Sequence, residues 1–144
     1  MEDCIFCKIA SSIVSSNVVY QDKEVFAFLD NNPIEKGHIL VIPKKHYQDI
    51  FDIPDETVCH VYAVVKKITN SISKNFDVKD FNILQNNGSK AGQTVFHYHV
   101  HIIPRYREFK LCLGKGEMRR DEDIRDGQKD YCSEEIAELI RKEI

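Results

Sequence analysis

Three histidines alternate with apolar or aromatic residues in the last third of the chain: His97, His99 and His101. Side chains of a β-strand point to its two faces in turn, so a strand over 96–103 would present all three imidazoles on one face. A lone histidine in a strand is usually an ordinary polar surface residue. Three in alternation indicate a face of the strand that is given to chemistry.

Phosphorus chemistry suits such a face, because a neutral imidazole is a good nucleophile near pH 7, with an ordinary pKa of about 6.5. Attack on phosphorus also needs donors that neutralise the non-bridging oxygens and serve the leaving group. Gly92-Gln93-Thr94, just before the histidines, offers backbone N–H groups, an amide and a hydroxyl. The sequence therefore predicts a phosphate site at this loop.

A metal site is the competing interpretation of the histidines. Alternate residues of a strand stand about 6.6 Å apart and the outer two about 13 Å, so one ion with ligand bonds of about 2 Å takes two neighbours but hardly three. Cys4 and Cys7 have the spacing of two zinc thiolates, although two unrelated reduced thiols would look the same. A tetrahedral zinc needs two further ligands, and His46 and His97 are the natural candidates. That division leaves His99 free.

The elements that must position these residues follow from hydrophobic periodicity and turn signals. Apolar residues recur at spacings of three and four from Pro54 to about Phe76, which predicts one long amphipathic helix with the proline in its first position. Short apolar runs predict strands at 18–20, 25–29, 38–42, 81–85 and 96–103. The expected fold class is α+β: an antiparallel sheet of about five strands with one long helix packed on it.

The C-terminal part has a different composition. Residues 105–131 are charged and glycine-rich, which predicts a long loop. Ser133 is expected to cap a short terminal helix that carries Ile136, Leu139 and Ile140 on one side. We therefore expect a catalytic domain over 1–108 and a C-terminal extension of the same domain over 109–144.

Composition limits the function classes. The chain has 144 residues, 42% of them hydrophobic, and a formal charge of −3, which favours one globular domain and argues against a nucleic-acid partner. Its apolar runs are too short to span a membrane, and no secretory signal is visible at its start. We expect a cytoplasmic protein with reduced cysteines and no membrane partner.

The run from His97 to Ile103 resembles the His-φ-His-φ-His-φ-φ signature of the histidine-triad (HIT) nucleotide hydrolases and transferases, where φ is an apolar residue. The segments 5–9, 37–46 and 86–95 are similar to the family's N-terminal segment, first hairpin and phosphate loop. The resemblance spans about Cys4 to Arg107 and is nearer to the Hint and small bacterial branch than to the Fhit branch. The charged tail departs from it, because Hint proteins end in a tryptophan-containing segment.

The resemblance implies a role for each matching residue. His99 would form a covalent nucleotidyl-histidine intermediate that water resolves, while His101 and His38 surround the phosphate. The residues expected to contact the phosphate and the leaving group are Asn86, Gln93 and Thr94, with Thr94 also counted among the catalytic residues. Asp30 matches the acid that binds the ribose hydroxyls, and Phe6, Ile9 and Phe28 fall where the base pocket is lined. The alternatives are that Asp30 only starts its turn and that Phe28 belongs to the core.

The metal quartet Cys4, Cys7, His46 and His97 resembles the zinc site of some bacterial HIT proteins and of galactose-1-phosphate uridylyltransferases. By that resemblance we expect one structural zinc per chain, not required for catalysis, and no organic cofactor. We expect a homodimer, because a single helix covers only one face of the sheet and HIT proteins of this branch are generally two-fold dimers.

Three hypotheses about function stay open at this point. The first is an enzyme that cleaves at the α-phosphate of a purine nucleotide of the AMP type, such as a phosphoramidate or a dinucleotide polyphosphate. The second is a nucleotide-binding regulator or scaffold with incidental hydrolysis. The third is a small zinc protein whose histidines serve only the metal.

Overall fold

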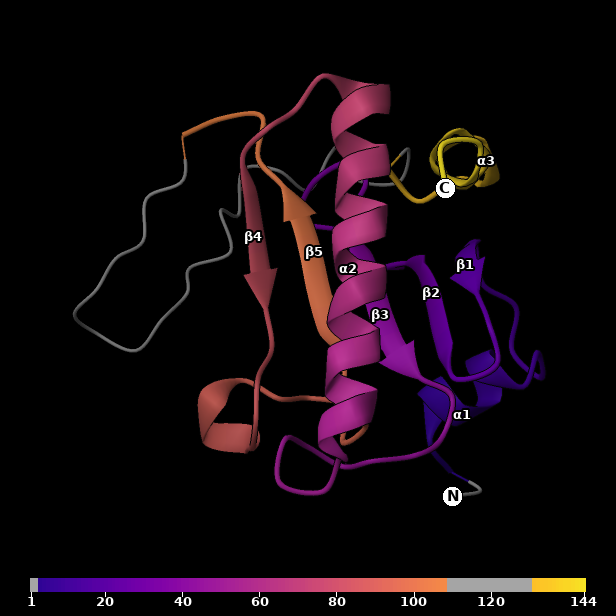
Figure 1. The fold of residues 1–144 in the computed structure, drawn as a ribbon, viewed down its shortest axis with the longest axis vertical. Helices are drawn as coiled ribbons and strands as arrows, with labels where there is room; N and C mark the ends of the chain where they lie inside the picture. Colours follow the sequence, from indigo (N-terminus) through magenta and orange to yellow (C-terminus); the bar gives the residue numbers. More distant parts are fainter. Residues whose placement is uncertain (1–2, 109–130) are drawn as a thin grey trace.

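The computed structural model describes residues 3–108 and 131–144, and it confirms the α+β fold class. Within these residues, one antiparallel sheet of five strands has the order β1-β2-β3-β5-β4, and three α-helices pack around it (Figure 1). The elements in chain order are α1 (Ile5–Ala10), β1 (Val18–Gln21), β2 (Val25–Leu29), β3 (Ile39–Pro43), α2 (Asp55–Phe76), β4 (Phe81–Leu84), a 3₁₀ turn (Ser89–Ala91), β5 (Val100–Pro104) and α3 (Glu134–Arg141).

The long helix α2 lies across one face of the sheet, as its periodicity predicts (Figure 1). Pro54 caps the helix instead of occupying its first position. The buried side chains of α2 and of this sheet face form the main core: Val61, Val64, Val65, Ile68 and Ile72 against Val25, Ala27, Leu29, Ile39, Val41, Val100 and Ile102. Each fully buried Val or Ile side chain contributes about 1.5–3 kcal/mol relative to exposure, so this layer fixes the strands that carry the site.

The terminal helix α3 completes the same layer beside β1 and α2. Its predicted cap is confirmed, since the Ser133 hydroxyl accepts a hydrogen bond from the Ile136 amide at 3.3 Å. Ile136, Ala137 and Ile140 are buried, whereas Leu139 is 42% exposed. Placing Leu139 on the packed side was therefore wrong, because the buried stripe is centred between Ile136 and Ala137 and turns Leu139 toward solvent.

The second face of the sheet is covered by α1, which the sequence analysis did not foresee. Phe6 and Ile9 pack on this face. Their partners in the sheet are Phe26, Phe28, Leu40 and Ile42. A helix of six residues is too short to show a clear helical period, so its apolar pair gave no signal. The expectation that only one face of the sheet has cover within the chain is corrected.

Strand β5 begins at Val100, not at Phe96 as expected. The Tyr98 amide donates to the Tyr47 carbonyl at 2.6 Å, so the chain before Val100 pairs with a loop instead of with β3. Of the three histidines, only His101 lies within β5, so strand alternation decides the direction of its side chain alone. His101 pairs with Leu40 of β3 and lies on the sheet face that α1 covers.

Of the expected C-terminal loop, residues 109–130 lie outside the described residues. The boundary expected at 108 between the catalytic domain and its extension adjoins these residues, so this division stays a prediction. No helix within 3–108 or 131–144 is long and apolar enough to cross a membrane.

Candidate active site

His99 lies just before β5, with its ring 4% exposed beneath α1. Its Nδ1 lies 2.7 Å from the carbonyl oxygen of His97. A carbonyl oxygen only accepts, so Nδ1 carries the proton and the lone pair of the neutral ring is on Nε2. Burial lowers the pKa of His99 below its ordinary value, although the His97 carbonyl and the Asp30 charge oppose the shift. At neutral pH the ring therefore presents an uncharged nucleophilic nitrogen.

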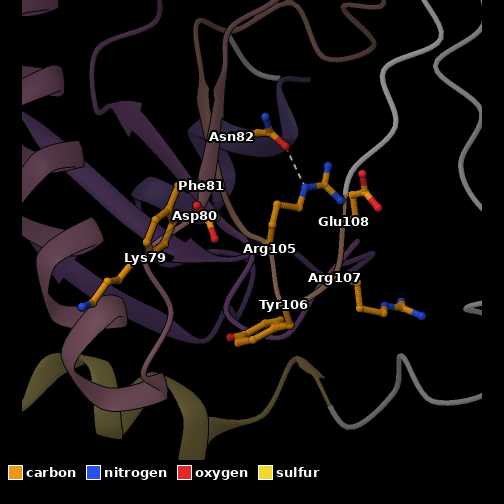
Figure 2. Close-up of a pocket in the computed structure, with 8 residues that line it drawn as sticks. All are labelled: Lys79, Asp80, Phe81, Asn82, Arg105, Tyr106, Arg107 and Glu108. Carbon is orange, nitrogen blue, oxygen red and sulfur yellow. Dashed lines mark hydrogen bonds between the residues drawn. The ribbon is translucent and has the colours of Figure 1, made fainter.

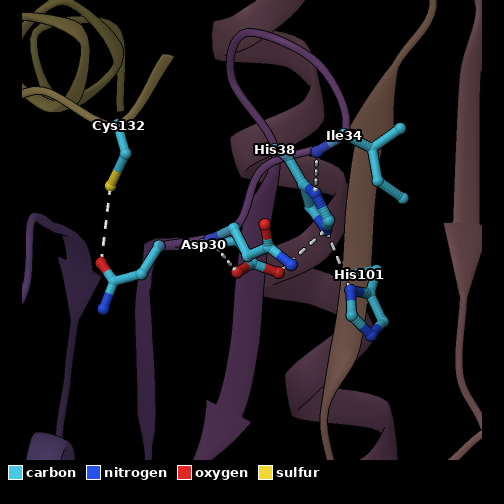
Figure 3. Close-up of polar contacts among 7 residues, drawn as sticks. Asp30, Ile34, His38, His101 and Cys132 are labelled. Atoms are coloured by element: carbon cyan, nitrogen blue, oxygen red, sulfur yellow. Dashed lines mark hydrogen bonds and ion pairs between the residues drawn. The ribbon is translucent and has the colours of Figure 1, made fainter. Parts of the chain in front are cut away.

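His38 and His101 form a hydrogen-bonded pair beside it (Figure 3). The Ile34 amide donates to Nδ1 of His38 at 3.0 Å, which leaves the proton of that ring on Nε2. His38 Nε2 lies 2.9 Å from Nδ1 of His101 and donates to it, so His101 keeps its own proton on Nε2. The rings of His101 and His99 follow at 5.0 Å between centroids.

The same burial keeps the pair uncharged. Desolvation lowers the pKa of His38 to about 4, against the opposing charge of Asp30, and that of His101 to about 3. His101 is pushed further down by its histidine neighbours. His38 and His101 thus form a hydrogen-bonded pair with defined proton positions, and the His99 ring lies against His101, which suits proton transfer beside His99.

Asp30 follows β2 and uses its two carboxylate oxygens differently. Oδ1 accepts from the Asn32 amide at 2.8 Å and closes the turn, which is the structural alternative considered above. Oδ2 lies 3.5 Å from Nε2 of His38, so the carboxylate also faces the histidines. Figure 3 shows Asp30, His38 and His101 converging from separate segments. A ribose contact stays a prediction.

Asp30, His38 and His101 lie close enough together to be considered as metal ligands, since one ligand atom of each falls within 4.8 Å of the others. The hydrogen-bond pattern argues against it. The Ile34 amide occupies the Nδ1 lone pair of His38, so Nε2 bears a proton and has no lone pair for a metal. This cluster is suited to moving protons, not to holding an ion.

The loop before the histidines has a different internal structure from the one expected. The Gln93 side chain is buried, with Oε1 accepting from the Gly88 amide and Nε2 donating to the Gln48 carbonyl, both at 2.7 Å. The Gly92 and Gln93 amides also bond within the loop. A phosphate contact by Gln93 would require one of these bonds to break, and it stays a prediction. Asn86 is half-buried and Thr94 is exposed, so both side chains are accessible.

Phe6, Ile9 and Phe28 are all buried in the second core cluster, between α1 and the sheet. Phe6 is central to it. Its ring contacts Phe28 edge-on at 5.7 Å between centroids and His99 at 5.1 Å. The trio therefore lies together beside His99, and Phe28 is core at the same time. Its role in a base pocket stays a prediction.

The four residues expected to share a metal do come together. Nδ1 of His97 lies 3.4 Å from Sγ of Cys4 and 3.5 Å from that of Cys7, which in turn is 3.4 Å from Nδ1 of His46. A tetrahedral zinc with bonds of about 2.3 Å to sulfur and about 2.05 Å to nitrogen requires S···N edges of about 3.5 Å. His97 also donates from Nε2 to the Pro43 carbonyl at 2.8 Å, which leaves Nδ1 free to ligate. Thus the donor set and its spacing fit zinc.

A separate pocket of about 650 Å³ lies between residues 79–82 and 105–108 (Figure 2). It sits where Phe81 pairs with Pro104, whereas His101 pairs with Leu84 at the other end of the same ladder. Arg105 crosses it and donates from Nε to Asn82 at 2.7 Å. No histidine is among the described residues that line it, so this pocket is not the site of His97, His99 and His101.

The groups that sequence reasoning missed are backbone atoms. The Ile34 amide and the carbonyls of Pro43 and His97 decide which nitrogen of His38, His97 and His99 bears a proton. Side-chain identity carries no signal for such contacts, because any residue type supplies the same N–H or C=O.

Residues 12–108 match the model of the HIT domain family. The chain is 47% identical over 116 residues to "Protein hit" of Bacillus subtilis (strain 168), covering 81% of this chain and 75% of that protein. It is also 39% identical over 123 residues to the "Adenylylsulfatase HINT3" of Arabidopsis thaliana, covering 85% of this chain and 61% of that one. The crystal structure of a Zn-bound histidine triad family protein from Mycobacterium smegmatis superposes with a TM-score of 0.76 at 35% identity, covering 98% of this chain and 92% of that one.

The protein is therefore a member of the HIT family, as its histidine motif predicts.

Proposed function

We propose that this protein is a nucleotidyl hydrolase that cleaves at the α-phosphate of a purine nucleotide through a covalent nucleotidyl-His99 intermediate. The observation that carries the proposal is the hydrogen bond from Nδ1 of His99 to the His97 carbonyl, which leaves the Nε2 lone pair free, as a nucleophile requires. A general role as a nucleotide-binding hydrolase is what membership of the family supports.

The proposed reaction has two displacements at phosphorus. In the first, Nε2 of His99 bonds to the α-phosphorus while the bond to the leaving nitrogen or oxygen breaks. The leaving group takes the proton from Nε2 of His101, and solvent returns a proton to that ring, which stays neutral. The modified His99 ring carries a positive charge, which its Nδ1–H shares with the His97 carbonyl. In the second, water bonds to phosphorus and gives one proton back to solvent, and the nucleoside monophosphate leaves as the His99–phosphorus bond breaks. His38 holds His101 in the tautomer that the first step needs.

The substrate class we favour is an AMP conjugate such as a phosphoramidate. The naming of one relative as an adenylylsulfatase supports an adenylyl group with a variable leaving group. The purified protein should be offered adenosine phosphoramidate, adenylyl-lysine, adenylyl sulfate, diadenosine polyphosphates and nucleotide sugars. Release of AMP from at least one at a rate abolished by a His99 substitution supports the enzyme. Tight AMP binding with no turnover of any would favour the regulator instead.

Replacement of Asp30 by alanine should weaken the binding of ribonucleotides more than the binding of their deoxy counterparts. Oδ2 of Asp30 faces His38 in the site, and each hydrogen bond from a ribose hydroxyl to this charged acceptor is worth about 1.5–3 kcal/mol. We expect about a tenfold larger rise in Kd for AMP than for 2′,3′-dideoxy-AMP by calorimetry. Equal losses for both ligands would remove Asp30 from the ribose site and leave it the role of closing its turn.

The pH dependence of kcat/KM should show an acid limb below the ordinary histidine value of 6.5, because burial lowers the pKa of His99 and the reactive form is the neutral one. Activity is then constant at neutral pH and falls only on the acid side of the ordinary histidine value, as the ring gains a proton. Circular dichroism in the same buffers checks that the fold persists. An acid limb centred at or above 6.5 would mean that the nucleophile is not this buried ring.

The metal quartet completes the proposal with one structural zinc per chain, held by Cys4, Cys7, His46 and His97. When bound, the ion would tie α1 to the segments that carry the two histidines, without joining the reaction. The spacing of the four ligand atoms supports this proposal, and so does the zinc-bound relative from Mycobacterium smegmatis.

We also propose a homodimer. Strand β4 is an edge strand of the sheet, and its residue Ile83 is 37% exposed. On α2, Tyr62 is 42% exposed. An unpaired edge with apolar neighbours favours pairing with a second copy. Sedimentation equilibrium at micromolar concentration should give twice the chain mass of 16.7 kDa, and a monomeric mass would refute the dimer.

A further inference from the structure

We propose that metal binding at Cys4, Cys7, His46 and His97 and nucleotide binding beside His99 are energetically coupled, through His97 and Phe6. The inference rests on the proposed nucleotide site. It differs from the proposal of a purely structural ion, because the affinity for the metal and the affinity for the nucleotide each depend on whether the other is bound.

His97 belongs to both sites at once. Its Nδ1 faces the two thiols at 3.4 and 3.5 Å, and its Nε2 donates to the Pro43 carbonyl at 2.8 Å. Its own carbonyl oxygen accepts the Nδ1 proton of His99 at 2.7 Å. The ring is fully buried. One residue thus links the metal ligands to the hydrogen bond that sets the tautomer of the nucleophile, and a shift of its ring is transmitted to its backbone.

Phe6 gives a second, independent connection. It lies in α1 between Cys4 and Cys7, and its ring meets His97 edge-on at 5.9 Å and His99 at 5.1 Å between centroids. A helix of six residues is unstable on its own and depends on tertiary contacts. Metal ligation by the two cysteines would anchor both sides of Phe6. Without it, α1 is held by the packing of Phe6, Ile9 and Ala10 on the sheet, and the wall beside His99 loosens.

Coupling between two ligands is reciprocal, so it predicts two equal ratios. The metal should tighten AMP binding by a certain factor, and AMP should tighten metal binding by the same factor. Coupling through contacts of this kind is typically about 5–150-fold, and we expect about tenfold. An ion that only stabilises the fold, with α1 in place either way, gives a ratio of one.

The test compares zinc-loaded protein with protein stripped by a chelator, with binding of AMP measured by calorimetry. The expected result is an AMP Kd about tenfold higher in the metal-free protein, matched by an equal change in zinc affinity from chelator competition with and without AMP. Equal AMP affinities within twofold would overturn the coupling while leaving the nucleotide site intact. If AMP bound neither form, the proposed function itself would fall, and the coupling with it.

Two further measurements guard against a trivial loss of fold. Nitrogen–proton correlation spectra of the histidine rings should show His99 as the Nδ1–H tautomer in the loaded protein and as a mixture in the metal-free protein. A Phe6→Leu variant keeps all four ligands and should hold zinc, but its two AMP affinities should differ less than threefold. A tenfold ratio that persists in Phe6→Leu would remove Phe6 from the connection, and an unchanged His99 tautomer in the metal-free protein would remove His97.

Discussion

His99→Ala is expected to lose at least about 10³-fold in kcat while AMP still binds. The substitution removes the Nε2 atom that the hydrogen bond from Nδ1 to the His97 carbonyl leaves unprotonated, and loss of an activated nucleophile costs enzymes this much or more. His38 and His101, which we propose surround the phosphate, keep their mutual hydrogen bond. AMP affinity by calorimetry should therefore stay within about tenfold of the wild type.

The matched control is His60→Ala. His60 lies on α2, is half-buried and binds the Asp22 carboxylate at 2.7 Å, away from the triad. Its loss tests the effect of removing a histidine as such, and kcat should change less than twofold. Retention of a tenth of the wild-type kcat in His99→Ala would contradict the assignment of the nucleophile.

Replacing both Cys4 and Cys7 by serine should remove the zinc and lower Tm by about 10 °C or more. A ligand present at 1,000 times its Kd stabilises the folded state by about 4 kcal/mol, and for a chain of this length each kcal/mol shifts Tm by about 3 °C. The change leaves the core beneath α2 intact, so the protein should still fold. Metal analysis and thermal unfolding of protein purified without chelators measure both effects.

Cys59→Ser serves as the control for that experiment, because Cys59 is an exposed thiol on α2 outside the quartet. It should keep one zinc per chain and an unchanged Tm. No zinc in the wild-type protein would end the metal proposal, and an unchanged Tm after zinc loss would mean that the ion does not stabilise the fold.

Elements with a long, repeated pattern could be predicted from the sequence. Helix α2 shows its period over six turns, and β2 over 25–29 is flanked by clear turn residues, so both were placed to within a residue. Helix α1 and the start of β5 could not be predicted. Helix α1 is shorter than two turns. Strand β5 begins only after Tyr98, because the Tyr98 amide hydrogen-bonds to Tyr47 instead of pairing with a strand.

The residue types of the candidate site could also be foreseen, but not its proton arrangement. Cys4, Cys7, His46 and His97 were grouped by ligand chemistry, and they do lie together. Which nitrogen of each ring is free depends on backbone atoms of Ile34, Pro43 and His97, which no residue pattern reveals. Gln93 shows the same limit, because its amide was expected at a phosphate and is bound to the loop backbone.

Trapping the intermediate tests the central claim most directly. The protein is mixed with an excess of a substrate that it turns over, quenched within the burst under alkaline denaturing conditions that preserve phosphoramidates, and analysed by intact mass and peptide mapping. We expect a single nucleotidyl adduct located on His99, absent in His99→Ala. An adduct on another residue, or steady turnover with no adduct and no burst of leaving group, would contradict nucleophilic catalysis by His99.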